Sequence, residues 1–216
     1  MPVSEKEQQQ INSLVAGFEA STGIQAVAAV VAKADAYPEI PWKAYAIGSA
    51  LGALVVACFP LLLADWNVAS TLAYYAMSIV GAGAVLALAA ALVPAAGRLF
   101  LDRVRAEGEV RQYGLAMFVE RQIFCTPERC AILLLVSRYE RVAVILPDTG
   151  LAQYAPRAEV ECIAAEMRAA LASRGVAAAF EAGFEGLKAL IQARGRVPTP
   201  LTANLLDDAM ITEKGA

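Results

Sequence analysis

The pattern of hydrophobic and polar positions divides the chain into an apolar middle and two mixed flanks. Between Ala44 and Gly97 there is a single charged residue, Asp65, whereas charges recur throughout both flanks. A helix needs roughly 20 residues to cross a hydrocarbon core about 30 Å thick. The middle is therefore long enough for two membrane spans, which we expect at about 44–64 and 68–93.

The lysines and arginines near these spans predict their orientation. Lys33 and Lys43 precede the first span and Arg98 follows the second, whereas the loop between the spans has no basic residue. Basic residues favour the cytoplasmic side, so we expect both termini in the cytoplasm. Polar residues after Met1 predict that no cleavable signal peptide opens the chain. The alternative is a helical hairpin buried inside a large soluble core.

Small residues recur at helical spacing inside both predicted spans. Gly48 and Gly52 form a GxxxG pattern in the first, and Gly83 and Ala87 form a similar ridge in the second. Such residues let helix backbones approach closely in lipid. We expect the two spans to pack on each other through them, with an oligomer or partner face as the alternative. Neither span holds a charged residue, which disfavours a transport pathway.

The flanks show the periodicities of an α/β domain in two pieces. Segment 1–43 contains a capping box, Ser4-x-x-Glu7, then a helical apolar face and a buried strand at 24–32. It is too short to bury a core alone, so it needs segment 98–195. There the pattern predicts a helix at 103–124, strands at 131–136 and 141–146, and helices at 156–175 and 176–195. Segment 196–216 has the character of a turn-rich tail.

These elements predict an α/β sandwich of about three strands and four helices, interrupted after its first strand by a transmembrane hairpin at 44–97. The composition agrees with a membrane protein, since 58% of residues are hydrophobic and 18% are charged, with a mean hydropathy of +0.52. The net charge of −3 gives no basic footprint for nucleic acid. Histidine is absent, which excludes Ser-His-Asp and Cys-His catalysis and HExxH zinc sites.

Candidate chemistry is sparse. The sequence has no Walker loop, GxGxxG or GxSxG motif. Cys125, Cys130 and Cys162 could supply three thiolates to a metal, but no histidine is available as a fourth ligand. We therefore interpret them as small buried hydrophobic residues, kept reduced in the cytoplasm. Cys58 lies in the first predicted span.

Several stretches in this order resemble the TPM-domain family, in its bacterial membrane form with an inserted transmembrane hairpin. The resemblance implies a Rossmann-like α/β core and a multi-pass protein of the bacterial inner membrane. Relatives in the family are tied to photosystem repair, to weak acid-phosphatase activity with a divalent metal, and to an auxiliary subunit of an acetylcholine receptor. The stretches that carry the resemblance are Ser21-Thr22-Gly23-Ile24-Gln25, Ile132-Leu133-Leu134-Leu135-Val136-Ser137, Glu140-Arg141-Val142-Ala143-Val144, Pro147-Asp148-Thr149-Gly150-Leu151 and Asn204-Leu205-Leu206-Asp207-Asp208-Ala209-Met210-Ile211.

The chain departs from the phosphatase-like members in one loop. Those members have an Asn/Asp-Gly turn that can help a metal site, whereas this chain has Pro127-Glu128-Arg129-Cys130. Asp148, Glu128 and Asp208 are the candidate ligands for Ca²⁺ or Mg²⁺, which require several oxygens.

Two functions follow from these observations. We expect a non-catalytic accessory or assembly subunit without a cofactor. It would dock its cytoplasmic module onto a larger membrane protein complex or form a homo-oligomer in the bilayer. The alternative is a membrane-anchored, weak divalent-metal-dependent phosphatase, which would need the candidate carboxylates to converge.

Overall fold

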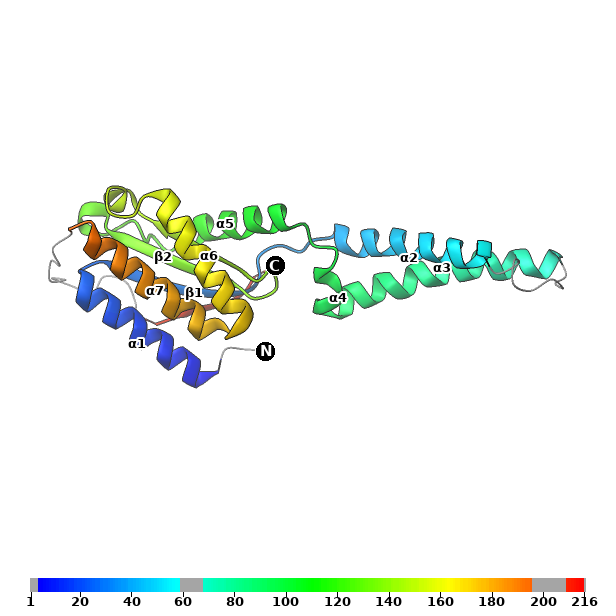
Figure 1. Ribbon diagram of the computed structural model, residues 1–216, viewed down its shortest axis with the longest axis horizontal. Coiled ribbons are helices and arrows are strands. Elements are labelled where there is room, and N and C mark those ends of the chain that lie inside the picture. The colour runs from blue at the N-terminus through cyan, green and yellow to red at the C-terminus, as the bar shows by residue number, and fades with distance from the viewer. Residues whose placement is uncertain (1–3, 59–67, 196–208, 216) are drawn as a thin grey trace. The chain divides into compact units, whose positions relative to one another are not determined.

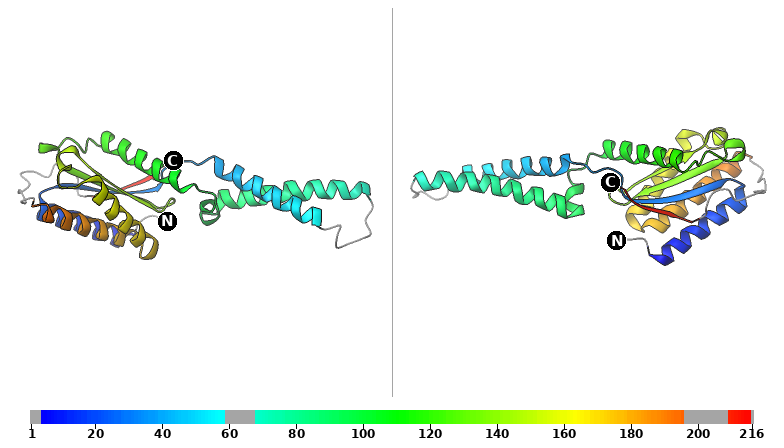
Figure 2. Two further views of the ribbon diagram at one scale, coloured as in Figure 1. Left: turned by 45° about the horizontal axis from the view of Figure 1, so that its top comes forward. Right: turned by 180° about the vertical axis from the view of Figure 1, so that it is seen from behind.

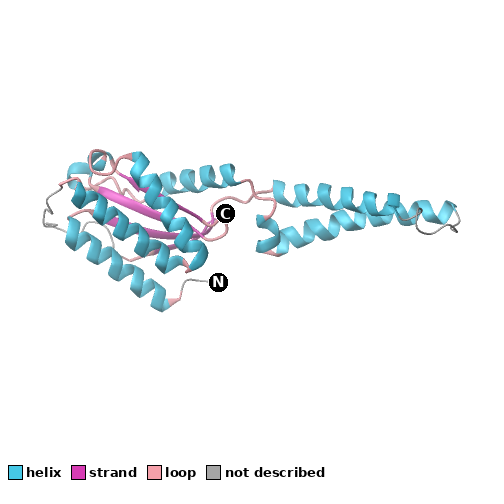
Figure 3. Ribbon diagram, viewed as in Figure 1, coloured by secondary structure: helices cyan, strands magenta, loops and turns pink. Residues whose placement is uncertain are grey.

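The computed structural model of the chain describes residues 4–58, 68–195 and 209–215 (Figure 1). Two compact units are formed. One joins the residues up to Asp35 with those from Val104 onward, and the other comprises Ala36–Arg103. In the described residues, the first unit contains a sheet and four long helices, and the second unit is helical (Figure 3).

The sheet has four strands in the order β3-β2-β1-β4. The central strand β1 (Gln25–Lys33) is parallel to both of its neighbours, β2 (Ala131–Ser137) and β4 (Ile211–Gly215). The edge strand β3 (Val142–Pro147) returns antiparallel to β2. This mixed sheet between helices confirms the predicted α/β class.

Helices cover both faces of the sheet (Figure 2). On one face lie α1 (Glu5–Thr22), α6 (Arg157–Ser173) and α7 (Val176–Ala193), and on the other lies α5 (Arg103–Glu120). Alternate residues of a strand point to opposite faces, so both sides of the strands need apolar residues. This explains why the central strands are continuous apolar runs in the sequence.

Local chemistry fixes the junction between α1 and β1. The predicted capping box at the start of α1 is present, with the Ser4 N–H donating to Glu7 Oε2 at 3.0 Å. Gly23 ends the helix with φ 65°, a conformation that glycine adopts without steric cost. The buried Glu19 carboxylate then accepts the Ala26 N–H at 2.7 Å, which ties the end of the helix to the strand.

Strand β4 was not predicted, because it lies within the segment interpreted as a turn-rich tail. Its sequence, Ile-Thr-Glu-Lys-Gly, is short and largely polar, and its pairing with β1 is what makes it a strand. Its central Glu213 accepts a hydrogen bond from Tyr113 Oη at 2.6 Å and forms an ion pair with Arg121 at 2.8 Å. Both partners belong to α5 or the turn that follows it, so β4 is held from the α5 face.

The helix predicted at 103–124 is also shorter than expected. It ends at Glu120 and is separated by residues 99–102 from a short helix, α4 (Pro94–Arg98). Pro94 stands at the start of α4, where its missing N–H costs least. The helix that begins at Arg103 is therefore separate from the helices of the hairpin.

The second unit is built on two long helices, α2 (Glu39–Cys58) and α3 (Val68–Leu92), which pack on each other. α2 begins before the predicted residue 44, and residues 59–64 lie outside the described chain. A Cβ atom on Gly48 would lie 2.7 Å from the Ala82 carbonyl oxygen, and one on Gly83 would lie 2.9 Å from the Tyr45 ring. Gly48 and Gly83 are thus at the closest approach of the two helices.

The other residues of the predicted ridges behave less uniformly. Gly52 is buried, and a Cβ there would lie 3.0 Å from the Ala82 side chain, whereas Ala87 is half-buried. Large apolar side chains elsewhere on the pair are exposed, and few residues of either helix are buried. Both helices are long and apolar enough to cross a membrane. A hairpin inside a soluble core would be mostly buried, whereas most of the described residues of these two helices are not. The exposed apolar residues include Leu51, Leu54, Val55, Leu72, Met77, Val80, Val85 and Leu88.

We predict that Gly48→Ala destabilises the helix pair. The added methyl group would meet backbone, which cannot move aside as a side chain can, so α2 and α3 must separate. Overpacking of this kind costs about 1–3 kcal/mol. Thermal unfolding of the full chain in detergent micelles, followed by circular dichroism, measures the effect. Gly81→Ala is the matched control, because a Cβ there meets nothing within 4 Å. Equal melting of the two variants would contradict the packing.

The link between α5 and β4 predicts an unusual tyrosine titration. Burial, with the hydrogen bond to Glu213 and the charge of that carboxylate, raises the pKa of Tyr113 to about 12. The folded chain therefore holds this proton more tightly than the unfolded chain, whose tyrosine pKa is near 10. Its contribution to stability is full below pH 10 and is lost as the pH rises towards 12.

The measurement is the difference in phenolate absorbance between the full chain and Tyr113→Phe. We expect it to be centred near pH 12, and Glu213→Gln should move it towards 10. A difference titration centred near 10 in the unmodified chain would show that the hydrogen bond does not hold in solution.

Candidate functional site

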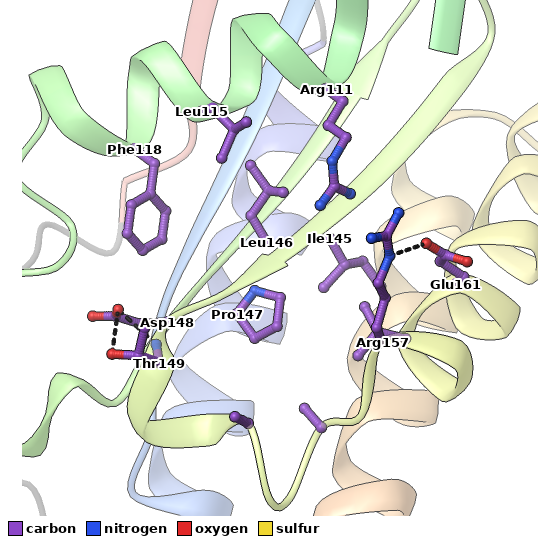
Figure 4. A pocket seen from close by; sticks show the side chains of 13 residues that line it. Arg111, Leu115, Phe118, Ile145, Leu146, Pro147, Asp148, Thr149, Arg157 and Glu161 are labelled. Carbon is purple, nitrogen blue, oxygen red and sulfur yellow. Dashed lines mark hydrogen bonds and ion pairs between the residues drawn. The ribbon is translucent and has the colours of Figure 1, made fainter. Parts of the chain in front are cut away.

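A groove follows the outer edge of the sheet, beside β3. It consists of two neighbouring cavities of about 460 and 320 Å³, lined by β3, α5 and α6. Figure 4 shows the larger of the two. Volumes of this size are typical of ligand sites. The two cavities share Arg111, Ile145, Arg157, Val160 and Glu161, so they form one continuous depression along the strand.

The topology explains why the groove lies there. The tight turn after β2 returns the chain as β3 at the edge, and the short helix η3 (Thr149–Leu151) then leads the chain to α6. Pro156 precedes α6 in an extended conformation, with φ −60°, and fixes where the helix begins. As α5 and α6 cover opposite faces of the sheet, side chains from both reach the edge between them.

The larger cavity is mostly apolar. α5 contributes Leu115 and Phe118, the strand contributes Leu146 and Pro147, and α6 contributes Val160. Figure 4 shows Leu115 and Phe118 of α5 on the side of the groove that faces Leu146 and Pro147. An apolar floor of this kind can take an aliphatic or aromatic group.

Charged groups line the opening. Arg111 on α5 and Arg157 on α6 point toward one another across the groove (Figure 4). Arg157 Nε donates to Glu161 Oε1 at 2.8 Å, and this hydrogen bond lowers the pKa of the Glu161 carboxyl. Arg111 makes no hydrogen bond or ion pair within the described part of the chain. Further along, Arg168 Nη1 donates to the Ala143 carbonyl oxygen at 3.5 Å. The opening therefore carries both signs of charge, since the carboxylates of Glu107 and Glu161 line it together with the arginines.

Asp148 closes the apolar end of the groove, but its carboxylate is already engaged. The side chain is 2% exposed, and Arg129 Nε donates to its two oxygens at 3.0 and 3.2 Å. The Thr149 N–H donates to Oδ1 at 2.7 Å, which caps η3. The carboxylate is thus neutralised by a cation and held by the backbone. These contacts give Asp148 a structural role in joining the two loops.

The loop that supplies Arg129 has an unusual backbone. Glu128 and Arg129 both have positive φ, at 62° and 55°. Opposite them lies Gly150, where a Cβ would lie 2.7 Å from the Arg129 carbonyl oxygen and closer still to that of Glu128. Gly150 therefore allows the loop before β2 and the loop after β3 to touch, and this contact places Arg129 beside Asp148.

This arrangement does not fit a metal ion. Of the candidate ligands, Asp148 is paired with Arg129, Glu128 is exposed on the neighbouring loop, and Asp208 lies outside the described residues. Within residues 4–58, 68–195 and 209–215, no three Asp, Glu, Cys or His side chains gather where they could hold a cation. Ca²⁺ and Mg²⁺ would need to displace an arginine and find further oxygens.

The prediction that the cysteines are buried is correct for one residue and wrong for two. Cys130 is buried, as predicted, and its thiol donates to the Glu128 carbonyl oxygen at 3.4 Å. Cys125 and Cys162 are exposed, so the interpretation of all three as buried hydrophobic residues is wrong for these two. Cys58 is exposed on α2.

The groove cannot be recognised from the sequence. Its arginines lie on two helices separated by β2 and β3, so no local motif joins them. One pattern could have indicated it. Arg157, Glu161 and Arg168 recur at helical spacing on one face of α6, which is the face that lines the smaller cavity.

Comparison with known proteins gives the fold alone. No family model matches the chain, and no curated protein matches it with significance. Among solved structures, the chain is similar to the NMR structure of the BA42 protein from the psychrophilic bacterium Bizionia argentinensis, with a TM-score of 0.56. The two are 8% identical, and the match covers 98% of this chain and 96% of the other.

The Arg129–Asp148 pair makes a prediction about stability. Arg129→Gln leaves a buried carboxylate without its cation, which we expect to destabilise the α/β unit by about 1–3 kcal/mol. Adding Asp148→Asn removes the stranded charge, so the double variant should be more stable than the single one. Chemical denaturation of the full chain in detergent measures both. If the double variant is the less stable, the carboxylate has another partner and the assignment of the pair is wrong.

Proposed function

We propose that this protein is a non-catalytic accessory or assembly subunit of a larger membrane protein complex. In this proposal the helix pair α2 and α3 is the membrane anchor, and the α/β unit is a binding module on the cytoplasmic side of the bacterial inner membrane. The resemblance to the TPM-domain family in its hairpin-bearing form is part of the same proposal.

The observation that carries the proposal is the exposed apolar surface of the helix pair. Leu54, Val55, Leu72 and Met77 are each more than half exposed, although they are large and apolar. Water would not stabilise such a surface over two helices of this length, whereas lipid or other membrane helices would. The contacts at the glycine residues occupy the faces that α2 and α3 turn toward each other. Their outer faces are therefore available to lipid or a partner.

The α/β unit supports a binding role rather than a catalytic one. Its groove offers an apolar floor and arginine side chains, which can hold a ligand. The buried acid beside the groove is paired with Arg129, so it is not poised as a base or as a metal ligand. No observation favours the phosphatase alternative over this one.

Affinity purification of the tagged full chain from native membranes in mild detergent tests the proposal. We expect a stoichiometric membrane complex to co-elute, identified by mass spectrometry. A chain that elutes alone or as a homo-oligomer would overturn the accessory role.

The cytoplasmic placement of the α/β unit is tested by a separate experiment. A variant that keeps Cys162 and replaces the other cysteines carries one exposed thiol on the α/β unit. It should react with a membrane-impermeant maleimide in inverted vesicles and stay unlabelled in intact cells. Labelling in intact cells would contradict the cytoplasmic placement.

A further inference from the structure

The larger cavity of the groove is an apolar hollow with an accessible rim. Leu146 and Pro147 of β3 face Leu115 and Phe118 of α5 across it (Figure 4). Leu115 is 49% exposed, although it is large and apolar, and Ala152 at the end of η3 is an exposed part of the lining. An apolar group that enters the cavity removes these side chains from water, which favours binding.

Charged side chains of both signs line the same cavity. The side chains of Arg111 and Arg157 point toward one another in Figure 4, and Glu161 lies beside Arg157. Arg157 Nε donates to Glu161 Oε1, whereas Glu161 Oε2 and the Arg111 guanidinium group make no hydrogen bond within the described residues. The hydrogen bond and charge of Arg157, and then the charge of Arg111, lower the pKa of Glu161. Glu161 is therefore ionised at neutral pH, and an unbonded carboxylate oxygen lies in the same opening as an unbonded guanidinium group.

We propose that this cavity binds a free α-amino acid with a large apolar side chain, of the kind of phenylalanine or leucine. The side chain of the ligand fills the apolar hollow, its carboxylate lies between Arg111 and Arg157, and its ammonium group contacts Glu161. The inference rests on the α/β unit alone. It therefore goes beyond the accessory role and does not depend on it.

The two signs of charge select for a zwitterion. A ligand with a carboxylate alone brings that group beside the ionised Glu161, and a ligand with an amine alone brings it beside two arginines. An α-amino acid carries both charges on one carbon, so each can meet its opposite in a small opening. Bonds from guanidinium groups to a carboxylate are charge-assisted and can be bidentate. Asp148 does not compete for the ammonium group, because Arg129 already neutralises it.

The size of the cavity favours a single amino acid over larger ligands. Its volume of about 460 Å³ lies towards the lower end of the range for small-molecule sites. A diacyl lipid is too large for it. In a peptide, the terminal ammonium and carboxylate groups are separated by the chain and do not lie on one carbon. The smaller cavity continues along β3 with Glu107 and Arg168, beyond the apolar hollow.

Calorimetric titration of the full chain in phosphatidylcholine nanodiscs tests the proposal. Nanodiscs are used because detergent monomers could occupy an apolar cavity. The probe is L-phenylalanine. Three comparison ligands each lack one feature: N-acetyl-L-phenylalanine lacks the ammonium group, L-phenylalanine amide lacks the carboxylate, and glycine lacks the side chain. We expect each of them to bind at least about tenfold more weakly than phenylalanine.

Variants of the charged residues separate the site from general charge attraction. Arg111→Gln and Glu161→Gln should each weaken binding of phenylalanine by about tenfold. Both side chains are exposed, so the fold should tolerate the changes. The matched controls are Arg174→Gln and Glu166→Gln, since both residues are exposed and line neither cavity. Equal losses in the controls would reduce the effect to net charge and overturn the site.

A further variant tests the cavity itself. Ala152→Phe places a ring at the rim of the cavity, on an exposed residue, and should abolish binding of phenylalanine. Ala158→Phe is the matched control, because Ala158 is exposed and lines neither cavity. If Ala152→Phe binds phenylalanine as the unmodified chain does, the ligand lies elsewhere and the site is wrong.

The ligands decide the remaining points. No binding of phenylalanine at about 10 mM would overturn the proposal, because millimolar affinity is expected even of a small ligand. Equal binding of the acetylated or amidated ligand would overturn recognition of the zwitterion, and equal binding of glycine would overturn the role of the apolar hollow. Failure of the accessory role is separate, since it shows as a chain that elutes from membranes without a partner.

Discussion

The pairing of β1 on both of its sides is the constraint on which the α/β unit depends. Its neighbours, β2 and β4, both follow the helix pair in the chain. A buried strand must satisfy its backbone groups, so β1 cannot form a stable structure before they arrive. The two ends of the helix pair are therefore tied to one folded unit, and α2 and α3 form an insertion into it.

The two edges of the sheet differ because of how the flanking strands are held. At one edge, Glu213 of β4 is fastened to α5 by Tyr113 and Arg121. At the other, β3 is flanked by α5 and α6, with arginines over its outer side. The buried Asp148 at the end of β3 serves the same framework, because its ion pair and the contact at Gly150 join the loops at that end.

Much of the fold could be predicted because long apolar patterns determine it. The runs at 24–32 and 131–136 and the helical faces of α1, α6 and α7 are strong periodic patterns. β4 was missed because pairing, and not its polar sequence, makes it a strand. The groove depends on side chains far apart in sequence, which no local pattern reveals. Likewise, positive φ at Glu128 and Arg129 is imposed by the neighbouring loop, since neither residue favours that conformation.

The central position of β1 also has a consequence for synthesis of the chain. About a hundred residues separate β1 from β2, and a ribosome adds about 5–20 residues each second. The apolar strand must therefore wait for roughly 5–20 s before its first partner is made, and longer for β4. During that time α2 and α3 emerge and must be accommodated as well. Newly made chains should thus be most exposed to aggregation and to chaperones while β1 waits for its neighbours.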